Sequence, residues 1–582
     1  MKLTGGQIVV RALEAEGIEC CFGIPGTHNI ELYDALHEAA RVRPILVTDE
    51  QSAGFMADGF WRASGRLACI NLVPGAGLTH ALSGIAEAYL DGVPMLVLGC
   101  GIRRNDARAY QLHDVDQLAI AAPVTKAAWR PATGGELYPA IRRACALARS
   151  GTPGPVMLEI SIDHYLTRHE LDPASLAEPA REAPPAPTAA ELRRAVELLT
   201  AAGAQPLLYA GLGARDAQDE LMALAEELGA PVSTTIQGKG VFPESHPLFL
   251  WTGFGRSAPR FARDIAAARN VTLAIGCRFS EVGTGSYSFT PPGPLIHVDI
   301  NREVLGRNFP AEVAIASDAK AFLTALLAQL RKPEGRKVGK SEAVELRARI
   351  RAGHAEVRAG WLARRSAERV TPFVLLEALQ RVFGPETIFT ADSGNGTFLA
   401  MECLRLDRPG RFLAPVDYSC MGYAVPAALG AKLGRPGAPV VALAGDGAFL
   451  MTGLELLTAA AEGIPLVVCV LRDRELAQIA QFQATAFHRR TASVLPDFHL
   501  GSLAEAVGVE WHPLARDAEL EEVLETARAT VAAGRPVLLD VAIDYSEQTY
   551  FTRGVVRTTL GRLPWPDRLR FVARALTRRL SR

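Results

Sequence analysis

The sequence predicts an α/β protein made of three doubly wound, Rossmann-like domains, each built on a parallel sheet. One local pattern occurs three times, in residues 86–98, 225–236 and 459–471: the end of a helix, then Gly-x-Pro, then an apolar run. Glycine can take the left-handed conformation that ends a helix, and proline keeps the helix from continuing. The apolar runs suit parallel strands that are buried on both faces. Three copies this far apart indicate three domains rather than a solenoid.

Composition places the domain boundaries. Residues 176–190 form a Pro/Ala-rich linker, and Thr188 with Glu191 then opens a helix as a capping-box pair. Residues 331–354 begin with a polar stretch that is poor in apolar side chains, and they are assigned to a second linker. The predicted domains therefore span residues 1–175, 191–330 and 355–545, and residues 546–582 form a C-terminal tail.

Charge and composition exclude several classes of protein. The 582 residues are 49% hydrophobic and 21% charged with a formal net charge of -1, which is typical of a globular protein and argues against a nucleic-acid binder. No apolar run approaches the ~20 residues of a membrane-spanning helix. The nine cysteines are scattered without a CxxC pair, as expected of reduced thiols in the cytoplasm.

Both ends of the chain are expected to be helical. Thr4 and Gln7 make a second capping-box pair, and the start lacks the long apolar region of a signal peptide. The basic C-terminal stretch "RLRFVARALTRRLSR" is interpreted as an amphipathic helix packed on the body, in preference to a membrane or partner contact.

A carboxylate stands at the tip of an apolar strand. Residues 441–449 read "VALAGDGAF", so Asp446 follows a buried run and lies between two glycines. Ligands of open α/β sheets bind at the carboxyl ends of the strands, and the glycines let the backbone approach an anion closely. Asp473 ends the next apolar run, "PLVVCVLRDRE". Successive strands are often neighbours, and two carboxylates with phosphate oxygens suit Mg²⁺. A surface turn is the alternative for an isolated Gly-Asp-Gly, but the second acid favours the cation site.

A second candidate acid lies near the N-terminus, in "RPILVTDEQSAGFMADGFWRASG" (residues 43–65). Glu50 follows the apolar run Ile45–Val47 and precedes a helix. An acid in the first turn of a helix is also favoured by the helix dipole alone. The residues by themselves leave a structural and a catalytic role for Glu50 equally open.

Two long stretches carry a family resemblance. They are "DEQSAGFMADGFWRASGRLACINLVPGAGLTHALSGIAEAYLDGVPMLVLGC" and "DYSCMGYAVPAALGAKLGRPGAPVVALAGDGAFLMTGLELLTAAAEGIPLVVCVLRDRELAQI". They resemble the thiamine-diphosphate (ThDP) enzymes of the acetohydroxyacid (acetolactate) synthase, pyruvate oxidase and benzaldehyde lyase superfamily. The resemblance covers nearly the whole chain, in the order pyrimidine-binding, central and diphosphate-binding domain.

The resemblance implies a role for each candidate residue. Glu50 would hydrogen-bond the aminopyrimidine ring of ThDP and promote the imino tautomer that removes the acidic thiazolium proton. Asp446, Asp473 and the backbone carbonyl of Glu475 would bind Mg²⁺. Met421 would be the apolar wedge under the cofactor, and the Ser419 carbonyl would accept from the 4′-amino group. The cofactor-binding residues implied in this way are Glu50, Pro74, Ser393, Gly394, Asn395, Gly396, Ser419, Met421, Gly445, Asp446, Gly447, Ala448 and Asp473.

The resemblance also suggests residues on the substrate side. His28 matches a proton-shuttling histidine of benzaldehyde-lyase-like enzymes, and Gln111 matches a glutamine that contacts intermediates. His113 is close to Gln111 in sequence, and His80 is a third, weaker histidine candidate. Imidazole exchanges protons near neutral pH, as carbonyl addition requires. For His28 and His113 an ordinary surface-loop role stays open.

The chain departs from the family pattern at several positions. Asp473 stands where asparagine is usual, and Arg472 or Arg474 is expected to balance its charge. The Gly-Met-His-Gly stretch that accompanies FAD in acetohydroxyacid synthases is absent, so bound FAD is doubtful, and an empty central domain or another nucleotide stays open. In the family the pyrimidine domain of one chain faces the diphosphate domain of another, which implies a homodimer or a dimer of dimers with sites at the interface.

These observations lead to a functional prediction. The protein is expected to be a ThDP- and Mg²⁺-dependent carboligase or lyase that acts on 2-oxo acids or aldehydes in the manner of acetolactate synthase. The alternative is a 2-oxo acid decarboxylase or a benzaldehyde-lyase-like C–C lyase. A NAD-type oxidoreductase needs G-x-G-x-x-G, which "FGIPGTHN" and "AGLGARDA" lack. Intact Glu50, Asp446 and Asp473 argue against a non-catalytic relative.

Overall fold

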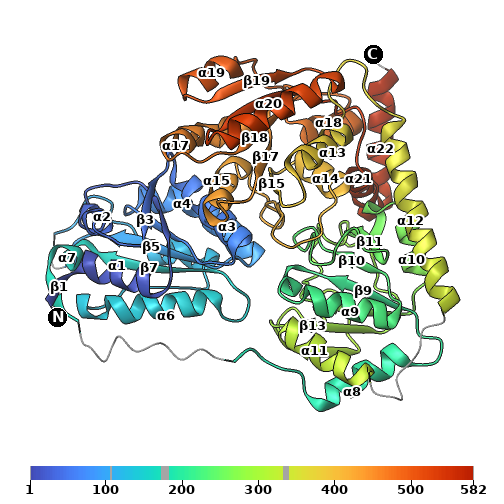
Figure 1. Cartoon of the computed structure of the whole chain (residues 1–582), viewed down its shortest axis with the longest axis horizontal. Helices are drawn as coiled ribbons and strands as arrows, with labels where there is room; N and C mark the ends of the chain where they lie inside the picture. The colour runs from blue at the N-terminus through green and yellow to red at the C-terminus, as the bar shows by residue number, and fades with distance from the viewer. Residues whose placement is uncertain (1, 105–107, 172–182, 332–339, 581–582) are drawn as a thin grey trace.

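Three sheets of six parallel strands, each flanked by helices, make up the chain (Figure 1). The computed structural model describes residues 2–104, 108–171, 183–331 and 340–580. In Figure 1 the N-terminal domain is blue, the central domain green and the C-terminal domain orange. The predicted fold class, three doubly wound parallel-sheet domains, is confirmed.

The N-terminal sheet has the strand order β3-β2-β4-β5-β7-β6. Its strands are β2 (Cys20–Gly23), β3 (Arg43–Leu46), β4 (Cys69–Leu72), β5 (Met95–Gly101), β6 (Ala127–Trp129) and β7 (Pro155–Ser161). Its helices are α1 (Gly5–Ala15), α2 (Ile30–His37), α3 (Glu50–Ser64), α4 (Ala76–Asp91), α5 (Gln117–Ala121), α6 (Leu137–Arg149) and α7 (Ile162–Leu166). A short antiparallel pair, β1 (Lys2–Thr4) with β8 (Arg168–Glu170), ties the start of the domain to its end.

The central sheet has the order β11-β10-β9-β12-β13-β14. Its strands are β9 (Pro206–Ala210), β10 (Val232–Thr234), β11 (Phe249–Thr252), β12 (Val271–Ile275), β13 (Leu295–Asp299) and β14 (Val313–Ala316). The helices around it are α8 (Ala189–Thr200), α9 (Gln218–Leu228), α10 (Arg260–Ala267) and α11 (Ala319–Leu330).

The C-terminal sheet has the order β16-β15-β17-β18-β20-β19. Its strands are β15 (Ile388–Ala391), β16 (Phe412–Leu413), β17 (Val440–Gly445), β18 (Val467–Arg472), β19 (Glu510–Leu514) and β20 (Val537–Ala542). Its helices are α13 (Pro372–Phe383), α14 (Asn395–Cys403), α15 (Ala424–Gly434), α16 (Asp446–Thr452), α17 (Leu456–Ala461), α18 (Ala477–Phe487), α19 (Leu500–Ala506) and α20 (Leu520–Ala532). The 3₁₀ turn η6 (Gly453–Glu455) joins α16 to α17.

The three Gly-x-Pro motifs form the helix-to-strand connections that the sequence predicts. Gly92, Gly229 and Gly463 have φ of 72°, 58° and 60°, in the left-handed region that favours glycine. The first two end α4 and α9, and Gly463 lies just after α17. The strands that follow, β5, β10 and β18, are buried over nearly their whole length.

The segments between the domains are only partly described. Residues 172–182 and 332–339, which hold much of the two predicted linkers, lie outside the described residues. Residues 340–354, also assigned to the second linker, belong instead to helix α12 (Lys340–Leu362). Its buried Leu346 and Ile350 explain why: this part of the connection packs on the body as a helix.

The C-terminal tail consists of two helices, α21 (Tyr550–Arg562) and α22 (Trp565–Leu580). Tyr550 is anchored to the C-terminal domain because its amide donates to Glu402 at 2.8 Å. Helix α22 packs on α18, where the Arg574 guanidinium lies 4.6 Å from the centre of the Phe487 ring. The tail is therefore helical and packed, as the sequence predicts.

Helices α3 and α15 bring the N-terminal and C-terminal domains into backbone contact (Figure 1). A Cβ added to Gly59 would lie 2.1 Å from the Ala427 carbonyl oxygen, and one added to Gly430 would lie 1.9 Å from that of Met56. No side chain fits at that separation. The two glycines therefore set how closely the domains approach each other.

A buried charge cluster reinforces the same contact. The Arg62 guanidinium donates to Asp58 at 2.7 Å and to Asp91 at 2.7 Å, and all three side chains are almost fully buried. Asp91 also accepts from the Asp417 amide of the C-terminal domain at 3.1 Å and from the Gln237 side chain of the central domain. The cluster thus joins all three domains, and removing one partner would leave uncompensated buried charge.

The glycine contact can be tested by substitution. Gly59→Ala is expected to lower the free energy of unfolding by at least about 2 kcal/mol, since the added methyl meets backbone that cannot rotate away. The change would appear as a lower midpoint in thermal or urea unfolding.

Gly360→Ala provides a matched control. Gly360 also lies in a helix, and a Cβ there would meet no atom within 4 Å. This variant should be neutral or slightly stabilising, because alanine favours the helix over glycine by up to about 1 kcal/mol. Equal midpoints for the two variants would contradict the role given to Gly59.

Candidate active site

Asp446 ties together the ends of two neighbouring strands. It is the first residue of α16, directly after β17, and is only 2% exposed. Its Oδ1 accepts from the Gly447 amide at 2.8 Å, and its Oδ2 accepts from the Arg474 amide at 2.7 Å. The second bond reaches the loop after β18, which pairs with β17. The predicted adjacency of these two strand ends is therefore confirmed.

Asp473 stands beside Asp446, and the two acids repel each other. Burial and the nearby Asp446 carboxylate raise the pKa of Asp473 to about 7, and burial raises the pKa of Asp446. The two arginines form their ion pairs elsewhere: Arg472 pairs with Asp540 and Asp497, and Arg474 pairs with Asp497, although the Arg472 charge lowers the pKa of Asp446 and so offsets part of the effect of burial. These arginines are drawn to other carboxylates around the loop. Paired oxygen donors of this kind fit a divalent cation such as Mg²⁺.

A cavity opens at these strand ends. It is lined by Asp392, Ser393, Gly394, Asn395, Gly396, Met421, Gly445, Asp446, Gly447, Ala448, Asp473, Glu475, Leu476, Gln478, Ile479 and Tyr545, among others. A Cβ built on Gly394 or Gly445 would meet no atom within 4 Å, so the backbone at these two glycines faces open space. Bare amides at the start of α14 and α16 fit a phosphate-bearing group.

The loop that carries Ser419 and Met421 is held from two sides. Ser419 has a φ of 66°, unusual for a residue with a side chain, and its hydroxyl lies 2.8 Å from that of Ser393. The Cys420 amide donates to Glu87 of α4 at 2.9 Å, and the Gly422 amide donates to Asp392 at 2.9 Å. Acidic side chains from two domains thus fix the position of Met421 at the cavity wall.

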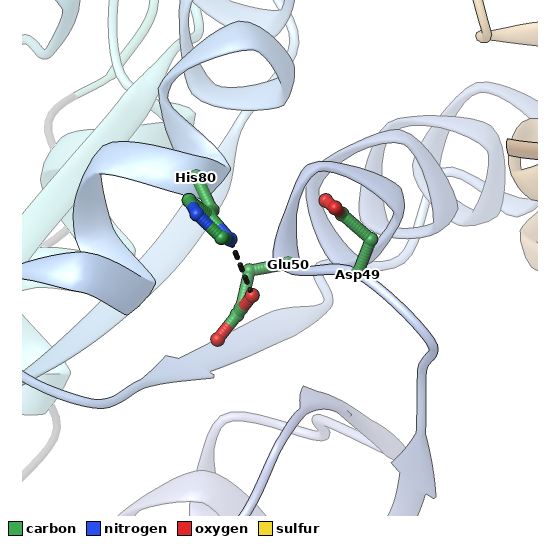
Figure 2. A group of neighbouring side chains, drawn as sticks. All are labelled: Asp49, Glu50 and His80. Carbon is green, nitrogen blue, oxygen red and sulfur yellow. Dashed lines mark ion pairs between the residues drawn. The ribbon is translucent and has the colours of Figure 1, made fainter. Parts of the chain in front are cut away.

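Glu50 begins α3 in the N-terminal domain, where Asp49 caps the helix by accepting from the Gln51 amide at 2.8 Å. The Glu50 side chain is only 9% exposed, and its Oε2 lies 3.3 Å from Nδ1 of His80. Figure 2 shows this pair beside Asp49. The ligand atoms of Asp49, Glu50 and His80 lie within 4.8 Å of one another.

The structure brings two of the predicted substrate-side residues together. The rings of His28 and His113 meet edge to face, with 5.4 Å between their centres. Burial, the neighbouring His113 and Arg103 lower the pKa of His28, so its imidazole is neutral at pH 7. Gln111 lies in the same loop but donates to the Arg108 carbonyl at 3.4 Å. Pro74 precedes Gly75, whose added Cβ would lie 3.5 Å from that of His113.

The predicted residues fall into two groups within one chain. The cavity at the strand ends is lined only by residues between 392 and 545, whereas Glu50, His28 and His113 belong to the N-terminal domain. Sequence reasoning missed Asp392 and Glu87, the residues that fix the loop carrying Ser419 and Met421. Asp392 follows the apolar run of β15, the same signal that marked Asp446.

A second cavity lies at the carboxyl ends of the central strands. Its lining includes Gly213, Thr235, Arg278, Asp299 and Asp417, so it reaches from the central into the C-terminal domain. Burial raises the pKa of Asp299 to about 6. The doubt about FAD stays a prediction, which the visible absorbance of the purified protein would check.

None of the helices in the described part of the chain is both long and apolar enough to cross a bilayer.

Known protein families match all three domains of the chain. Three family models match: the thiamine pyrophosphate enzyme N-terminal TPP binding domain at residues 3–120, the central domain at 192–326 and the C-terminal TPP binding domain at 392–541. The Corynebacterium glutamicum acetolactate synthase large subunit is 33% identical over 572 residues, covering 94% of this chain and 88% of that protein.

Two further relatives agree with this match. The probable acetolactate synthase large subunit of Methanocaldococcus jannaschii is 32% identical, covering 94% of this chain and 93% of that protein. The acetolactate synthase isozyme 3 large subunit of Escherichia coli is 30% identical and covers 94% and 96%. With the acids on neighbouring strand ends and this similarity over nearly its full length, the chain belongs to the thiamine pyrophosphate (ThDP) enzymes.

Proposed function

We propose that the protein is a ThDP- and Mg²⁺-dependent carboligase that acts on 2-oxo acids in the manner of acetolactate synthase. The observation that carries this proposal is the pair Asp446 and Asp473, which face a glycine-walled cavity at two adjacent strand ends. The similarity to acetolactate synthase large subunits over 94% of the chain supports the choice of reaction.

The C-terminal domain binds the cofactor in this proposal. Asp446, Asp473 and the Glu475 carbonyl hold Mg²⁺, and the backbone at Gly394–Gly396 and Gly445–Ala448 holds the diphosphate. Met421 and the Ser419 carbonyl support the organic part of the cofactor. When bound, ThDP supplies the electron sink for breaking and forming bonds next to a carbonyl. The protein supplies orientation and moves protons.

Glu50 is the acid that activates the cofactor ring. A general acid has to lie close to its proton acceptor and have a suitable proton affinity. Glu50 is buried at the start of α3, where a carboxyl is shielded from water. His28, His113 and Gln111 serve the substrate side, and the two imidazoles of His28 and His113 can take up and return protons during addition and release.

A decarboxylase or benzaldehyde-lyase-like C–C lyase is the second candidate, and the His28–His113 pair favours it. Two imidazoles whose ring centres lie 5.4 Å apart can pass a proton to a product that leaves without meeting an acceptor. Mass spectrometry of products from a panel of 2-oxo acids and aldehydes, with ThDP and Mg²⁺ added, decides between the candidates. Ligated products support the first and simple aldehydes the second.

We further propose that a second copy of the chain completes each active site. Within one chain the cavity has no lining from the N-terminal domain. The segment from α16 through η6 to the start of α17 exposes four large apolar side chains, each 43–55% exposed: Leu450, Met451, Leu454 and Leu457. Exposed large apolar side chains this close together in the sequence are typical of a surface that another protein covers. A homodimer or a dimer of dimers is the assembly that follows.

Glu50→Gln tests the role of the buried acid. The amide keeps the shape of the side chain but holds no exchangeable acidic proton, so turnover should fall by at least about a hundredfold. ThDP affinity, measured by calorimetry with Mg²⁺ present, should change little. Wild-type turnover in this variant would refute the assignment.

Asp446→Ala tests the cation site. Loss of one carboxylate should weaken Mg²⁺ binding and, with it, retention of ThDP during dialysis against EDTA followed by cofactor assay. Asp216→Ala is the control, because that side chain is 87% exposed in the central domain. If Asp446→Ala retained as much ThDP as the control, the metal assignment would be wrong.

Mixing the two inactive variants tests whether sites form between chains. A mixed dimer of Glu50→Gln and Asp446→Ala chains has one site with both defects and one with neither. Random pairing should therefore restore about a quarter of wild-type activity on co-expression. No recovery would place each complete site within a single chain.

A further inference from the structure

Glu50 has a histidine neighbour that the proposed function leaves without a role. His80 lies on α4, and its Nδ1 is 3.3 Å from Oε2 of Glu50 (Figure 2). The two side chains differ sharply in environment, since Glu50 is 9% exposed and His80 is 61% exposed. A buried carboxyl is thus in contact with an imidazole that reaches the surface.

The two oxygens of Glu50 face different surroundings. Oε2 points to the His80 ring, whereas Oε1 lies beside Gly77, one turn earlier on α4. A Cβ added to Gly77 would lie 3.2 Å from Oε1 and 2.8 Å from Val73. The glycine therefore keeps the space beside Oε1 open, and one face of α4 brackets the whole carboxyl.

Asp49 does not compete for the same contact. Its carboxylate already accepts from the Gln51 amide as the N-cap of α3. Figure 2 marks an ion pair between His80 and Glu50 and none from either residue to Asp49. The trio is therefore a helix cap beside an imidazole–carboxyl pair rather than a shared cation site.

We propose that His80 is a positioning residue for Glu50: its Nδ1–H donates to Oε2 and leaves Oε1 as the oxygen that serves the cofactor ring. The inference rests on the proposed function, in which Glu50 shares its proton with that ring. When the proton moves toward the ring, Glu50 becomes a carboxylate. A donor on its second oxygen stabilises that charged form, and such charge-assisted hydrogen bonds are the strong ones.

Two substitutions separate the hydrogen bond from the bulk of the ring. His80→Leu removes the donor and keeps an apolar side chain of similar reach, while His80→Asn places an amide N–H near the position of Nδ1. His37→Leu is a matched control, because His37 is an exposed histidine in the last turn of α2, before β3, whereas Glu50 follows the other end of that strand.

Three readouts are taken on the full-length protein with ThDP and Mg²⁺. The first is the dissociation constant of ThDP by calorimetry. The second is the rate at which the acidic carbon-bound proton of ThDP exchanges with D₂O without substrate, followed by acid quench and NMR. The third is kcat. Exchange reports on activation of the cofactor and does not depend on knowing the substrate.

His80→Leu is expected to slow exchange and kcat by about 10–100-fold, the effect of losing one hydrogen bond to a charged group. His80→Asn should restore both rates to within about threefold of wild type. The dissociation constant of ThDP should stay within about threefold of wild type in both variants. Exchange at the wild-type rate in His80→Leu, or equal losses in the leucine and asparagine variants, would overturn the inference.

Glu50→Gln distinguishes failure of this inference from failure of the proposed function. If Glu50→Gln abolishes exchange while His80→Leu leaves it intact, Glu50 keeps its role and only His80 loses its own. If Glu50→Gln exchanges normally, the role of Glu50 itself is wrong, and the inference about His80 falls with it.

Discussion

The rest of the structure depends on the backbone contact between α3 and α15. Gly59 and Gly430 let the two helices approach until backbone meets backbone, at a distance that no side chain tolerates. Helix α3 starts at Glu50, and α15 starts three residues after Met421. Because interiors are close-packed and hardly compressible, a contact this tight fixes two functional segments relative to each other. This helix pair thus positions functional residues of both domains relative to each other.

Buried charge gives this arrangement its specificity. Arg62 satisfies Asp58 and Asp91 together, and Asp91 also receives donors from the other two domains. Burial and the nearby Asp91 raise the pKa of Glu87 to about 9, so Glu87 is uncharged at pH 7 and adds no further buried charge to the group. Such clusters add little net stability, but a misplaced domain would leave charges unpaired. The junction therefore favours one relative placement of the three domains.

Local sequence patterns predicted the fold well, because each acts over a few residues. The capping boxes at Thr4 and Thr188 and the left-handed glycines of the Gly-x-Pro motifs form as expected. Asp446 and Asp473 were also predictable as neighbours, since successive parallel strands tend to pair. What the sequence left out depends on long-range packing. The ion pairs of Arg472 and Arg474, the hold of Glu87 on the Cys420 amide and the contact of His80 with Glu50 join distant segments, and no periodicity marks them.

Helix α4 has a consequence of its own. Its first turns carry Gly77 and His80 beside Glu50. Its last turns carry Glu87 and Asp91, which accept hydrogen bonds from the segment that holds Ser419 and Met421. In the proposed dimer the first and the last turns of α4 belong to different catalytic centres. One helix of each chain would then contribute residues to both centres of the proposed dimer.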